Sequence, residues 1–466
     1  MSENKKKGNP VAGFFKALGK DIAEIGTTFK EGSAGTRISY IILGAGQLMR
    51  GQIARGIGFL AAEILFFVYL FNFGLQYLSK MNTLGSAVRK FNADGTITKS
   101  SDNSFLILLY GLLTIILIVF FIFVWRLNIR DNRNTELLKK AGKPIPSNRQ
   151  DLHSLLDENF DKTLLTLPVL GIFIFTVLPI FFMILVAFTN YDAKHQPPAN
   201  LFTWVGFKNF ANLFSGNSAT GLGSTFLTVL LWTLIWAFFA TFLNYFLGIF
   251  VAMLINKKGI RFKKLWRTIL VMTIAVPQFV SLLYVSKMFA NDGLVNTYLL
   301  KWGWIDKAIP FWTNATYARI LIIVINLWVG IPYLMLIATG LLMNIPADLY
   351  ESAEIDGANH FQMFQKITLP YMLFVTGPYL LTSFTGNLNN FNVIYLLTQG
   401  GPQSMKLKGG AGYTDLLVTW LYKMVVNKTD YKMAAVIGIM VFIVTSVISV
   451  VVYNMLPSVK NEEGFQ

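Results

Sequence analysis

Eight long apolar stretches dominate this sequence and leave little choice of fold class. Each has about the 20 residues that a helix needs to cross the hydrocarbon core of a bilayer. That core offers no water to pair with backbone N–H and C=O groups, so segments of this kind span it as helices. We therefore expect an all-α integral membrane protein with about eight transmembrane helices. The expected spans are 57–77, 105–125, 164–188, 226–255, 265–289, 320–342, 369–391 and 433–456.

Charged residues are few and lie mainly between these stretches. They make up 14% of the chain, and the net charge is +16. Lysine and arginine gather in alternate links, after the second span and after the fourth. Basic links stay on the cytoplasmic side, so we expect a multi-pass protein of the cell membrane with both termini in the cytoplasm. A nucleic-acid-binding protein would gather its charge on one face, so we predict the lipid bilayer as a partner and no nucleic acid.

The links also divide the chain into expected parts. The glycine-rich segment 44–58 is too short to span, and it either allows close helix packing or serves as a surface linker. Glu63 lies about six residues into the first span, where pairing with an arginine or a water is favoured over a proton relay. The expected parts are an N-terminal cytoplasmic or interfacial segment (1–56), a transmembrane hairpin (57–126), a cytoplasmic linker (127–163), a membrane core (164–457) and a cytoplasmic tail (458–466).

The chain carries no recognisable reaction centre. It has no cysteine, and its three histidines, His153, His195 and His360, lie far apart in the sequence. Thiol chemistry is therefore excluded, and we expect no metal site. The phosphate-binding loop GxxxxGK[ST] of ATP hydrolases is absent. We predict no catalytic residue and no cofactor on this chain, which is not an enzyme.

A polar island, residues 351–370, interrupts the apolar pattern on the predicted cytoplasmic side, and the helix predicted to lead into it starts at residue 346. Pro346 suits the start of a helix and Gly357 can end it in the left-handed conformation, so the first half predicts a short helix. A second helix is expected to begin near Asn359 and to bury Phe361, Phe364 and Ile367. We expect it to end at Leu369–Pro370, because proline disfavours helical geometry in the residue before it. Such a helical pair outside the bilayer needs a partner on which to dock.

Two uncharged polar patches lie inside the sixth and seventh spans. The sixth carries Asn326 to Tyr333, where a glycine and a proline are predicted to break the helix; the seventh carries Ser383 to Asn392, with four asparagines. Amide groups left unpaired in hydrocarbon cost several kcal/mol, so they face protein or a wet path. Amides, hydroxyls and aromatic faces suit a neutral polyhydroxylated solute. The alternative is that the asparagines only join neighbouring helices.

The island resembles the EAA motif of binding-protein-dependent ABC importer permeases. That pattern reads Glu-Ala-Ala, three residues, Gly, nine residues, Ile, one residue, Leu-Pro. Here it begins at Glu351 with Ser352 in place of the first alanine, continues through Gly357 and Ile367, and ends at Pro370. The resemblance implies the type I ABC importer permease fold and makes 164–457 the permease core, with coupling helices at 346–370. Coupling to the ATPase would then involve Glu351, Ala353, Asp356, Gly357 and Ala358.

The rest of the core is similar to the larger, MalF-type permease subunit of maltose and maltodextrin importers. The matching segments are 188–192, 205–210, 275–278, 292–296, 389–402 and 413–417. Gly386 stands where an aromatic residue is found in the maltose permease, and Val329 where leucine is found, which leaves the exact sugar open. The sugar contacts that the family implies are Val329, Gly330, Tyr333, Ser383, Gly386, Asn387 and Asn390.

This resemblance also implies the partners. They are a second, MalG-like permease subunit, two ATPase subunits that bind the ATP, and an extracellular sugar-binding protein that delivers an oligosaccharide substrate. The outer link 189–224 is too short for the large periplasmic domain of enteric relatives, which favours a Gram-positive bacterium. The alternative function is an ion-coupled secondary carrier or a channel for neutral polar solutes.

Overall fold

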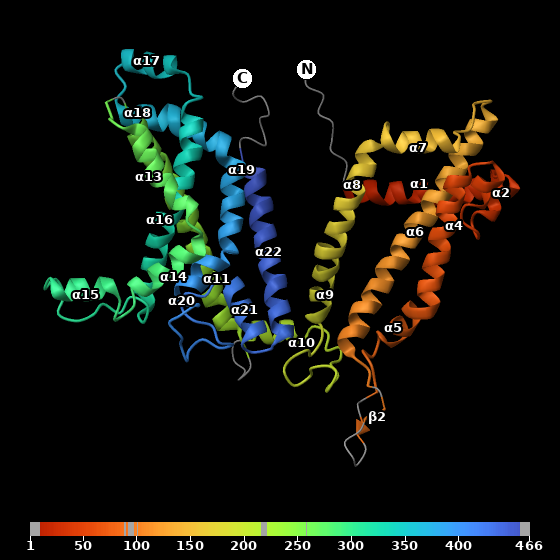
Figure 1. The fold of residues 1–466 in the computed structure, drawn as a ribbon, viewed down its shortest axis with the longest axis horizontal. Helices are drawn as coiled ribbons and strands as arrows, with labels where there is room; N and C mark the ends of the chain where they lie inside the picture. The colour runs from red at the N-terminus through yellow and green to blue at the C-terminus, as the bar shows by residue number, and fades with distance from the viewer. Residues whose placement is uncertain are drawn as a thin grey trace. The chain divides into compact units, whose positions relative to one another are not determined.

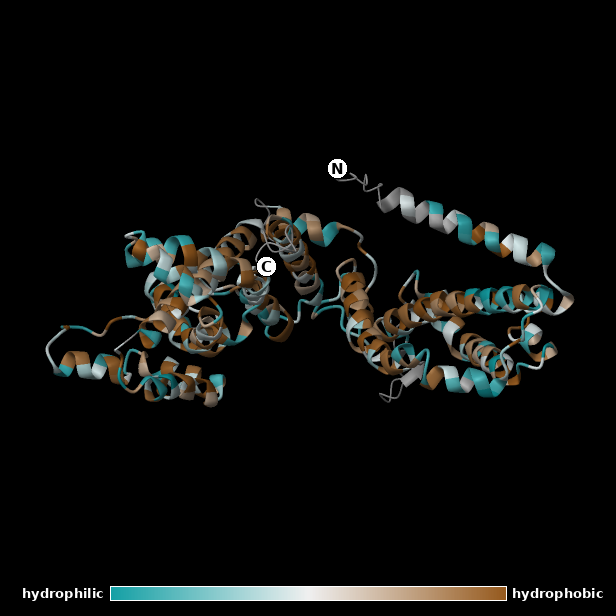
Figure 2. Cartoon of the chain, turned by 90° about the horizontal axis from the view of Figure 1, so that it is seen from above, coloured by the Kyte–Doolittle hydropathy of each residue, from teal (hydrophilic) through white to brown (hydrophobic). Residues whose placement is uncertain are grey.

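The computed structural model describes residues 10–87, 90–91, 97–99, 101–215, 221–257 and 259–456. Contacts group the chain into two units, Met1–Leu185 with Lys194–Trp204, and Val186–Ala193 with Val205–Gln466. Each unit is built almost entirely of helices (Figure 1). Apolar residues cover the long helices in Figure 2, and many of them are exposed, such as Leu167 at 79% and Phe175 at 80%. Exposed apolar surface on this scale fits contact with lipid.

The first unit contains the first three expected spans. α4, a π-helical turn (Leu70–Gly74) and α5 form one continuous helix, which packs on α6 through stacked rings of Phe66 and Phe121, 4.1 Å apart. The strands are short and pair antiparallel. The elements are α1 (Pro10–Glu31), α2 (Ala34–Ile38), α3 (Ala45–Met49), α4 (Ile53–Tyr69), α5 (Leu75–Lys80), β1 (Lys90–Phe91), β2 (Ile97–Lys99), α6 (Ser104–Lys140), α7 (Asn148–Leu156), α8 (Phe160–Ile172), a π-helical turn (Phe173–Val177) and α9 (Leu178–Val186).

The second unit holds the remaining spans and both polar patches. Its elements are α10 (Lys208–Phe214), α11 (Gly223–Phe238), a π-helical turn (Phe239–Leu243), α12 (Asn244–Asn256), α13 (Lys263–Ala275), α14 (Gln278–Met288), α15 (Leu294–Lys301), α16 (Ala315–Leu342), α17 (Ala347–Ile355), α18 (His360–Met363), a π-helical turn (Phe364–Thr368), α19 (Leu369–Leu388), α20 (Phe391–Thr398), α21 (Leu417–Val426) and α22 (Tyr431–Met455).

Seven continuous helices in the described ranges are long and apolar enough to cross a membrane, and an eighth span is broken. This confirms the all-α membrane fold with about eight spans. The expected continuous fifth span is wrong in detail, because α13 and α14 meet at a bend of 91°. Val276 is extended and Pro277 follows it. Proline forces the preceding residue out of helical geometry, which explains the bend.

The structure also describes the segments between the expected spans. α6 continues as a helix to Lys140, so residues 127–140 of the expected linker are helical, and α8 and α9 up to Leu185 group with the first unit. The glycine-rich segment packs closely, because a Cβ on Gly44 would lie 2.1 Å from the carbonyl oxygen of Gly56. Glu63 accepts a hydrogen bond from the Leu43 amide at 2.8 Å, a backbone partner that the sequence did not predict.

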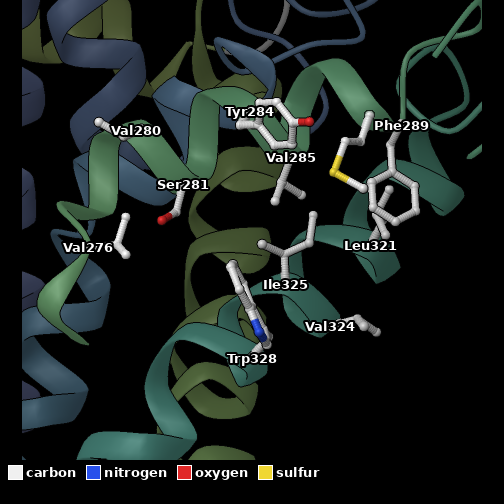
Figure 3. Close-up of a pocket in the computed structure, with 11 residues that line it drawn as sticks. Val276, Val280, Ser281, Tyr284, Val285, Phe289, Leu321, Val324, Ile325 and Trp328 are labelled. Carbon is white, nitrogen blue, oxygen red and sulfur yellow. The ribbon is translucent and has the colours of Figure 1, made fainter. Parts of the chain in front are cut away.

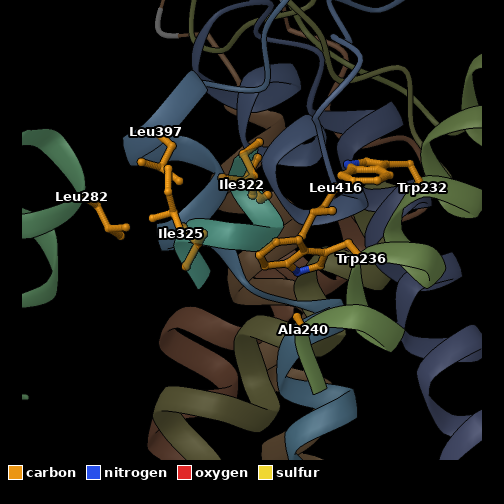
Figure 4. Packing of buried hydrophobic residues seen from close by; sticks show 10 residues of the cluster. Trp232, Trp236, Ala240, Leu282, Ile322, Ile325, Leu397 and Leu416 are labelled. Atoms are coloured by element: carbon orange, nitrogen blue, oxygen red, sulfur yellow. The ribbon is translucent and has the colours of Figure 1, made fainter. Parts of the chain in front are cut away.

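Large buried side chains hold α11, α14, α16, α20 and α21 together. Trp232 and Trp236 form the centre of this cluster with Ile322 and Leu416, as Figure 4 shows. Each indole N–H reaches a backbone carbonyl, that of Trp232 the Thr414 oxygen and that of Trp236 the Asn387 oxygen, both at 3.1 Å. A buried tryptophan needs such a partner. The bond from Trp236 therefore links this core to Asn387, which belongs to the polar patch of the seventh span.

Candidate functional site

The polar patch of α16 lies on an unbroken helix. α16 runs from Ala315 to Leu342 with Pro332 inside it, so the predicted break at the glycine and proline is wrong. Pro332 is buried, and neighbouring helices allow a proline in a membrane helix. Proline has no N–H, so the carbonyl of Trp328 loses its helical partner. The patch therefore exposes one polar backbone group without unwinding.

Gly330 on α16 forms a notch that receives a side chain from α12. A Cβ at Gly330 would lie 2.6 Å from Nδ2 of Asn244 and 2.8 Å from its Cγ and Oδ1. Asn244 is buried and donates to the Ala240 carbonyl at 2.8 Å, while its Oδ1 has no hydrogen-bond partner. Val329 packs against the tryptophan cluster. These contacts fix one turn of α16, directly before Tyr333.

Tyr333 and Ser383 lie on α16 and α19. Tyr333 is 53% exposed, and Ser383 is half-buried. Tyr379, one turn before Ser383 on α19, interacts with the Ser383 hydroxyl. Tyr379 thus adds a hydroxyl group to the predicted set on these two helices.

Asn387 on α19 and Asn390 at the start of α20 form a second polar group, beginning about one turn beyond Ser383. Asn387 donates from Nδ2 to the Thr241 hydroxyl at 3.0 Å, and Asn390 donates to Oδ1 of Asn387 at 3.2 Å. The Asn390 Oδ1 also accepts from the Val393 amide at 3.3 Å and so caps α20. Gly386 is exposed, and a Cβ there would meet no atom within 4 Å. The structure thus brings Asn387 and Asn390 together beside open space.

Charge is absent from this set of side chains. The seven predicted contacts consist of hydroxyls, amides, one valine and two glycines, and their exposed or half-buried faces donate and accept hydrogen bonds. The apolar pocket of about 570 Å³ between α14 and α16, shown in Figure 3, is a different place. Val280, Tyr284 and Trp328 line it, and none of the seven residues does. Its lining is too apolar to bind a solute rich in hydroxyl groups.

The predicted coupling residues lie on α17 and in the turn to α18. These two helices lie at one end of the second unit, and α15, α20 and α21 at the other (Figure 1). Gly357 has φ +78°, the left-handed geometry expected of it, and the Ala358 amide donates to the Ala353 carbonyl at 2.9 Å to close the helix end. Glu351 and Asp356 are exposed. Asn359 begins α18 with a reciprocal cap to Gln362.

The second helix of the pair differs from its prediction. α18 continues through a π-helical turn (Phe364–Thr368) into α19, so no helix end occurs at Pro370. A π-helical turn is wider than an α-helical one. This one lies shortly before Pro370, which has no backbone N–H to donate. Phe361 is 70% exposed rather than buried, and Met363 takes the inner position. The exposed ring therefore adds to the outer surface of the pair.

Some contributors to the site were missed by sequence reasoning. Asn244 and Thr241 belong to the fourth apolar stretch, where a lone amide within hydrocarbon was a usable signal. Tyr379 and Trp236 carried no signal, because aromatic residues are common in membrane helices and only tertiary contacts give these two a role.

Together, the membrane fold, the uncharged polar patches on two neighbouring spans and the exposed helical pair at one end are features of a membrane permease. The chain belongs to the family described as "Binding-protein-dependent transport system inner membrane component", whose model matches residues 244–460. This confirms the resemblance drawn from the EAA-type motif.

Relatives along almost the whole chain support the same assignment. The galactooligosaccharides transport system permease GanP of Bacillus subtilis is 37% identical over 91% of this chain and 97% of its own length. The maltodextrin transport system permease MdxF of the same organism is 36% identical over 91% and 95%. The maltose/maltodextrin permease MalF of Escherichia coli K12 is 34% identical, over 56% of this chain and 50% of its own length.

A solved structure shows the same fold. A chain of a bacterial ABC transporter involved in the import of alginate, an acidic polysaccharide, matches with a TM-score of 0.53 at 22% identity. The match covers 65% of this chain and 97% of the other. The type I importer permease fold predicted from the sequence is thereby confirmed.

Proposed function

We propose that this chain is a permease subunit of an ATP-driven carbohydrate importer, which moves oligosaccharides of the maltodextrin type delivered by an external binding protein. The observation that carries the proposal is the identity of 36–37% to two oligosaccharide permeases over 91% of the chain. The uncharged polar set on α16 and α19 supports it, because a neutral sugar needs donors and acceptors but no counter-ion.

The substrate contacts we propose are Tyr333, Ser383, Asn387 and Asn390, with Val329, Gly330 and Gly386 shaping the space. Asn387 donates one hydrogen bond to Thr241 and accepts one from Asn390. A primary amide has two donors and an acceptor with two lone pairs, so each retains groups for a ligand. The open space at Gly386 is room for a sugar ring where the resemblance places an aromatic side chain.

The coupling we propose runs through α17 and α18 to ATPase subunits. Apolar side chains on this pair are exposed, namely Leu349 at 50%, Ile355 at 87% and Phe361 at 70%. Exposed apolar surface of this kind marks a protein interface. The proposed assembly contains this chain, a second MalG-like permease, two ATPase subunits that hold the ATP and a sugar-binding protein. Closure of the ATPases would switch the permease pair between inward-facing and outward-facing states.

The orientation and the source are part of the proposal. We propose that both termini lie in the cytoplasm, on the same side of the membrane as α17 and α18, because the basic links favour that orientation. The short link between the third and fourth spans and the long matches to Bacillus subtilis relatives favour a Gram-positive cell membrane.

Alanine substitutions in the asparagine patch test the proposed sugar contacts. In the reconstituted complex, Asn387→Ala and Asn390→Ala should lower sugar uptake at least tenfold, because each loses a proposed sugar contact. Asn389→Ala is the matched control, since Asn389 is exposed and bonds only its own helix, to Thr385. If all three variants take up sugar as fast as the wild type, Asn387 and Asn390 do not contact the sugar and only join neighbouring helices. Thermal unfolding of each complex separates lost binding from lost folding.

A competition experiment tests the substrate and the energy source. Labelled maltotriose uptake should be inhibited by unlabelled maltodextrins more strongly than by galactooligosaccharides, and it should require ATP. Uptake that continues without an ATPase subunit and collapses with an ionophore would support an ion-coupled carrier instead.

A further inference from the structure

The helical hairpin of α2, α3 and the turn between them, residues 34–49, has its polarity inverted. We call it the entry hairpin. Its interior is polar: Thr36, Ser39 and Gln47 are completely buried. Its surface is mainly apolar: Ile38 is 42% exposed, Ile41 79%, Ile42 48% and Met49 66%. The exposed Arg37 donates to the Phe29 and Lys30 carbonyls. A hairpin that stood in water would arrange these residues the other way round.

Contacts along α6 and α4 fix the direction of the entry hairpin. At its base, Glu136 accepts from the Ser33 amide at 2.7 Å and from the Arg50 guanidinium at 2.9 Å. At its tip, the Tyr40 carbonyl accepts from the Trp125 indole N–H at 2.9 Å. Trp125 and Glu136 lie eleven residues apart on one helix, which corresponds to about 16 Å. The tip therefore extends from the charged end of α6 towards its apolar part.

The tip also reaches the interior of the first span. The Leu43 amide donates to Glu63, which lies ten residues into α4, and the Gly44 amide donates to Oδ1 of Asn128 at 3.1 Å. The apolar surface of the tip thus continues onto that of α4, where Ile64 and Leu65 are exposed. Both surfaces then face the same surroundings.

The backbone N–H groups of the turn, and most of its carbonyls, are paired within the protein. Every N–H from Ser39 to Ala45 has an acceptor, at 2.8–3.2 Å. The Ser39 carbonyl accepts from Nδ2 of Asn128 and the Tyr40 carbonyl from Trp125. Irregular backbone at membrane depth is tolerated only where its polar groups are satisfied within the protein. A turn in water has no need of a buried asparagine, a glutamate and a tryptophan for this purpose.

We propose that the entry hairpin is a re-entrant membrane element, whose tip at Ile41 and Ile42 inserts among the acyl chains of the leaflet next to the charged end of α6. That leaflet is the cytoplasmic one in the proposed orientation. The occupant of the apolar surface is lipid, because the surface is continuous with a lipid-facing span and the ion pair that flanks the hairpin, Arg50–Glu136, lies at its base. The Arg126–Asp21 pair lies near the tip, where α6 meets α1. Glu63 then serves to cap the turn inside the membrane.

Single cysteines test the insertion cleanly, because the chain has none of its own. Ile41→Cys and Ile42→Cys are made in the full chain, labelled with bimane in detergent and reconstituted into nanodiscs with doxyl-labelled lipids. Leu65→Cys, on the exposed face of α4, is the lipid control, and Lys143→Cys, an exposed residue after α6, is the water control. Unlabelled nanodisc samples are treated with a membrane-impermeant charged maleimide.

We expect bimane at Ile41 and Ile42 to be quenched by doxyl lipids within twofold of Leu65. We also expect maleimide to react with both cysteines at least tenfold more slowly than with Lys143→Cys. Fast reaction without quenching would make the hairpin a water-exposed loop and overturn the proposal. Slow reaction without quenching would show that protein, such as a second copy of the chain, covers the surface, and would overturn it as well.

Discussion

Replacing Gly330 by alanine tests whether this glycine matters because of its neighbour Asn244 or because of the sugar. The added Cβ would lie 2.6–2.8 Å from three atoms of the Asn244 side chain, well inside van der Waals contact. The amide has to move, and its hydrogen bond to the Ala240 carbonyl at 2.8 Å is strained or lost. Overpacking of a core costs about 1–3 kcal/mol. We expect Gly330→Ala to lower the stability of the complex by that amount and to reduce uptake.

The double variant Gly330→Ala with Asn244→Ala separates the two explanations. Asn244→Ala removes the obstructing amide. The only hydrogen bond lost with it is the one to the Ala240 carbonyl, which lies within a helix. We therefore expect the double variant to recover most of the stability and uptake lost in Gly330→Ala, with a coupling energy of about 1–2 kcal/mol in a double-mutant cycle. Gly340→Ala on the same helix is the control, since its Cβ meets no atom within 4 Å.

The assays are thermal unfolding of the purified complex and sugar uptake in proteoliposomes. Recovery in both readouts would assign Gly330 to the packing of α12 on α16. A coupling energy of zero would refute this reasoning. A loss of uptake with unchanged unfolding temperature, not repaired by Asn244→Ala, would mean that Gly330 acts through the substrate.

Other parts of the structure give further predictions. Gly357→Val, at φ +78°, should strain the turn by at least about 1 kcal/mol and reduce uptake by the reconstituted complex, whereas Gly357→Asn should retain most of it, because asparagine tolerates this geometry. Asp415→Asn should lower the free energy of unfolding by about 3–5 kcal/mol, because it leaves the buried Lys423, 2.6 Å away, without a counter-charge. Adding Lys423→Gln to this variant should restore part of the lost stability, as measured in a thermal scan. Hydrogen bonds from Lys80 and from the Ser86 and Ala87 amides lower the pKa of Asp102 from 3.8 to about 2. Its stabilising contribution is therefore complete above about pH 4 and lost as the pH falls towards 2, so the unfolding temperature should drop more between pH 5 and pH 3 in the wild type than in Asp102→Asn.

The sequence predicted what depends on local pattern, and missed what depends on neighbours. Apolar length was enough to find the spans, and Gly357 was enough to place the turn after α17, because only glycine adopts that geometry without cost. The unbroken α16 was not predictable from Pro332 alone, since packing against other helices decides whether a membrane proline breaks a helix. The partners of Asn387 and Asn244 lie far away in the sequence and required the structure.

The error at Pro370 has a consequence for coupling. A helix end there would have left a flexible joint between the exposed pair and the seventh span. The structure instead has one uninterrupted helix from His360 to Leu388, about 40 Å long at 1.5 Å per residue. Its first turn carries the exposed Phe361, and its last turn carries Asn387, which bonds Thr241. We therefore expect a displacement of α18 by the proposed partner to be passed along a continuous helix to the polar patch, with the π-helical turn at Phe364–Thr368 as the place where that helix can bend.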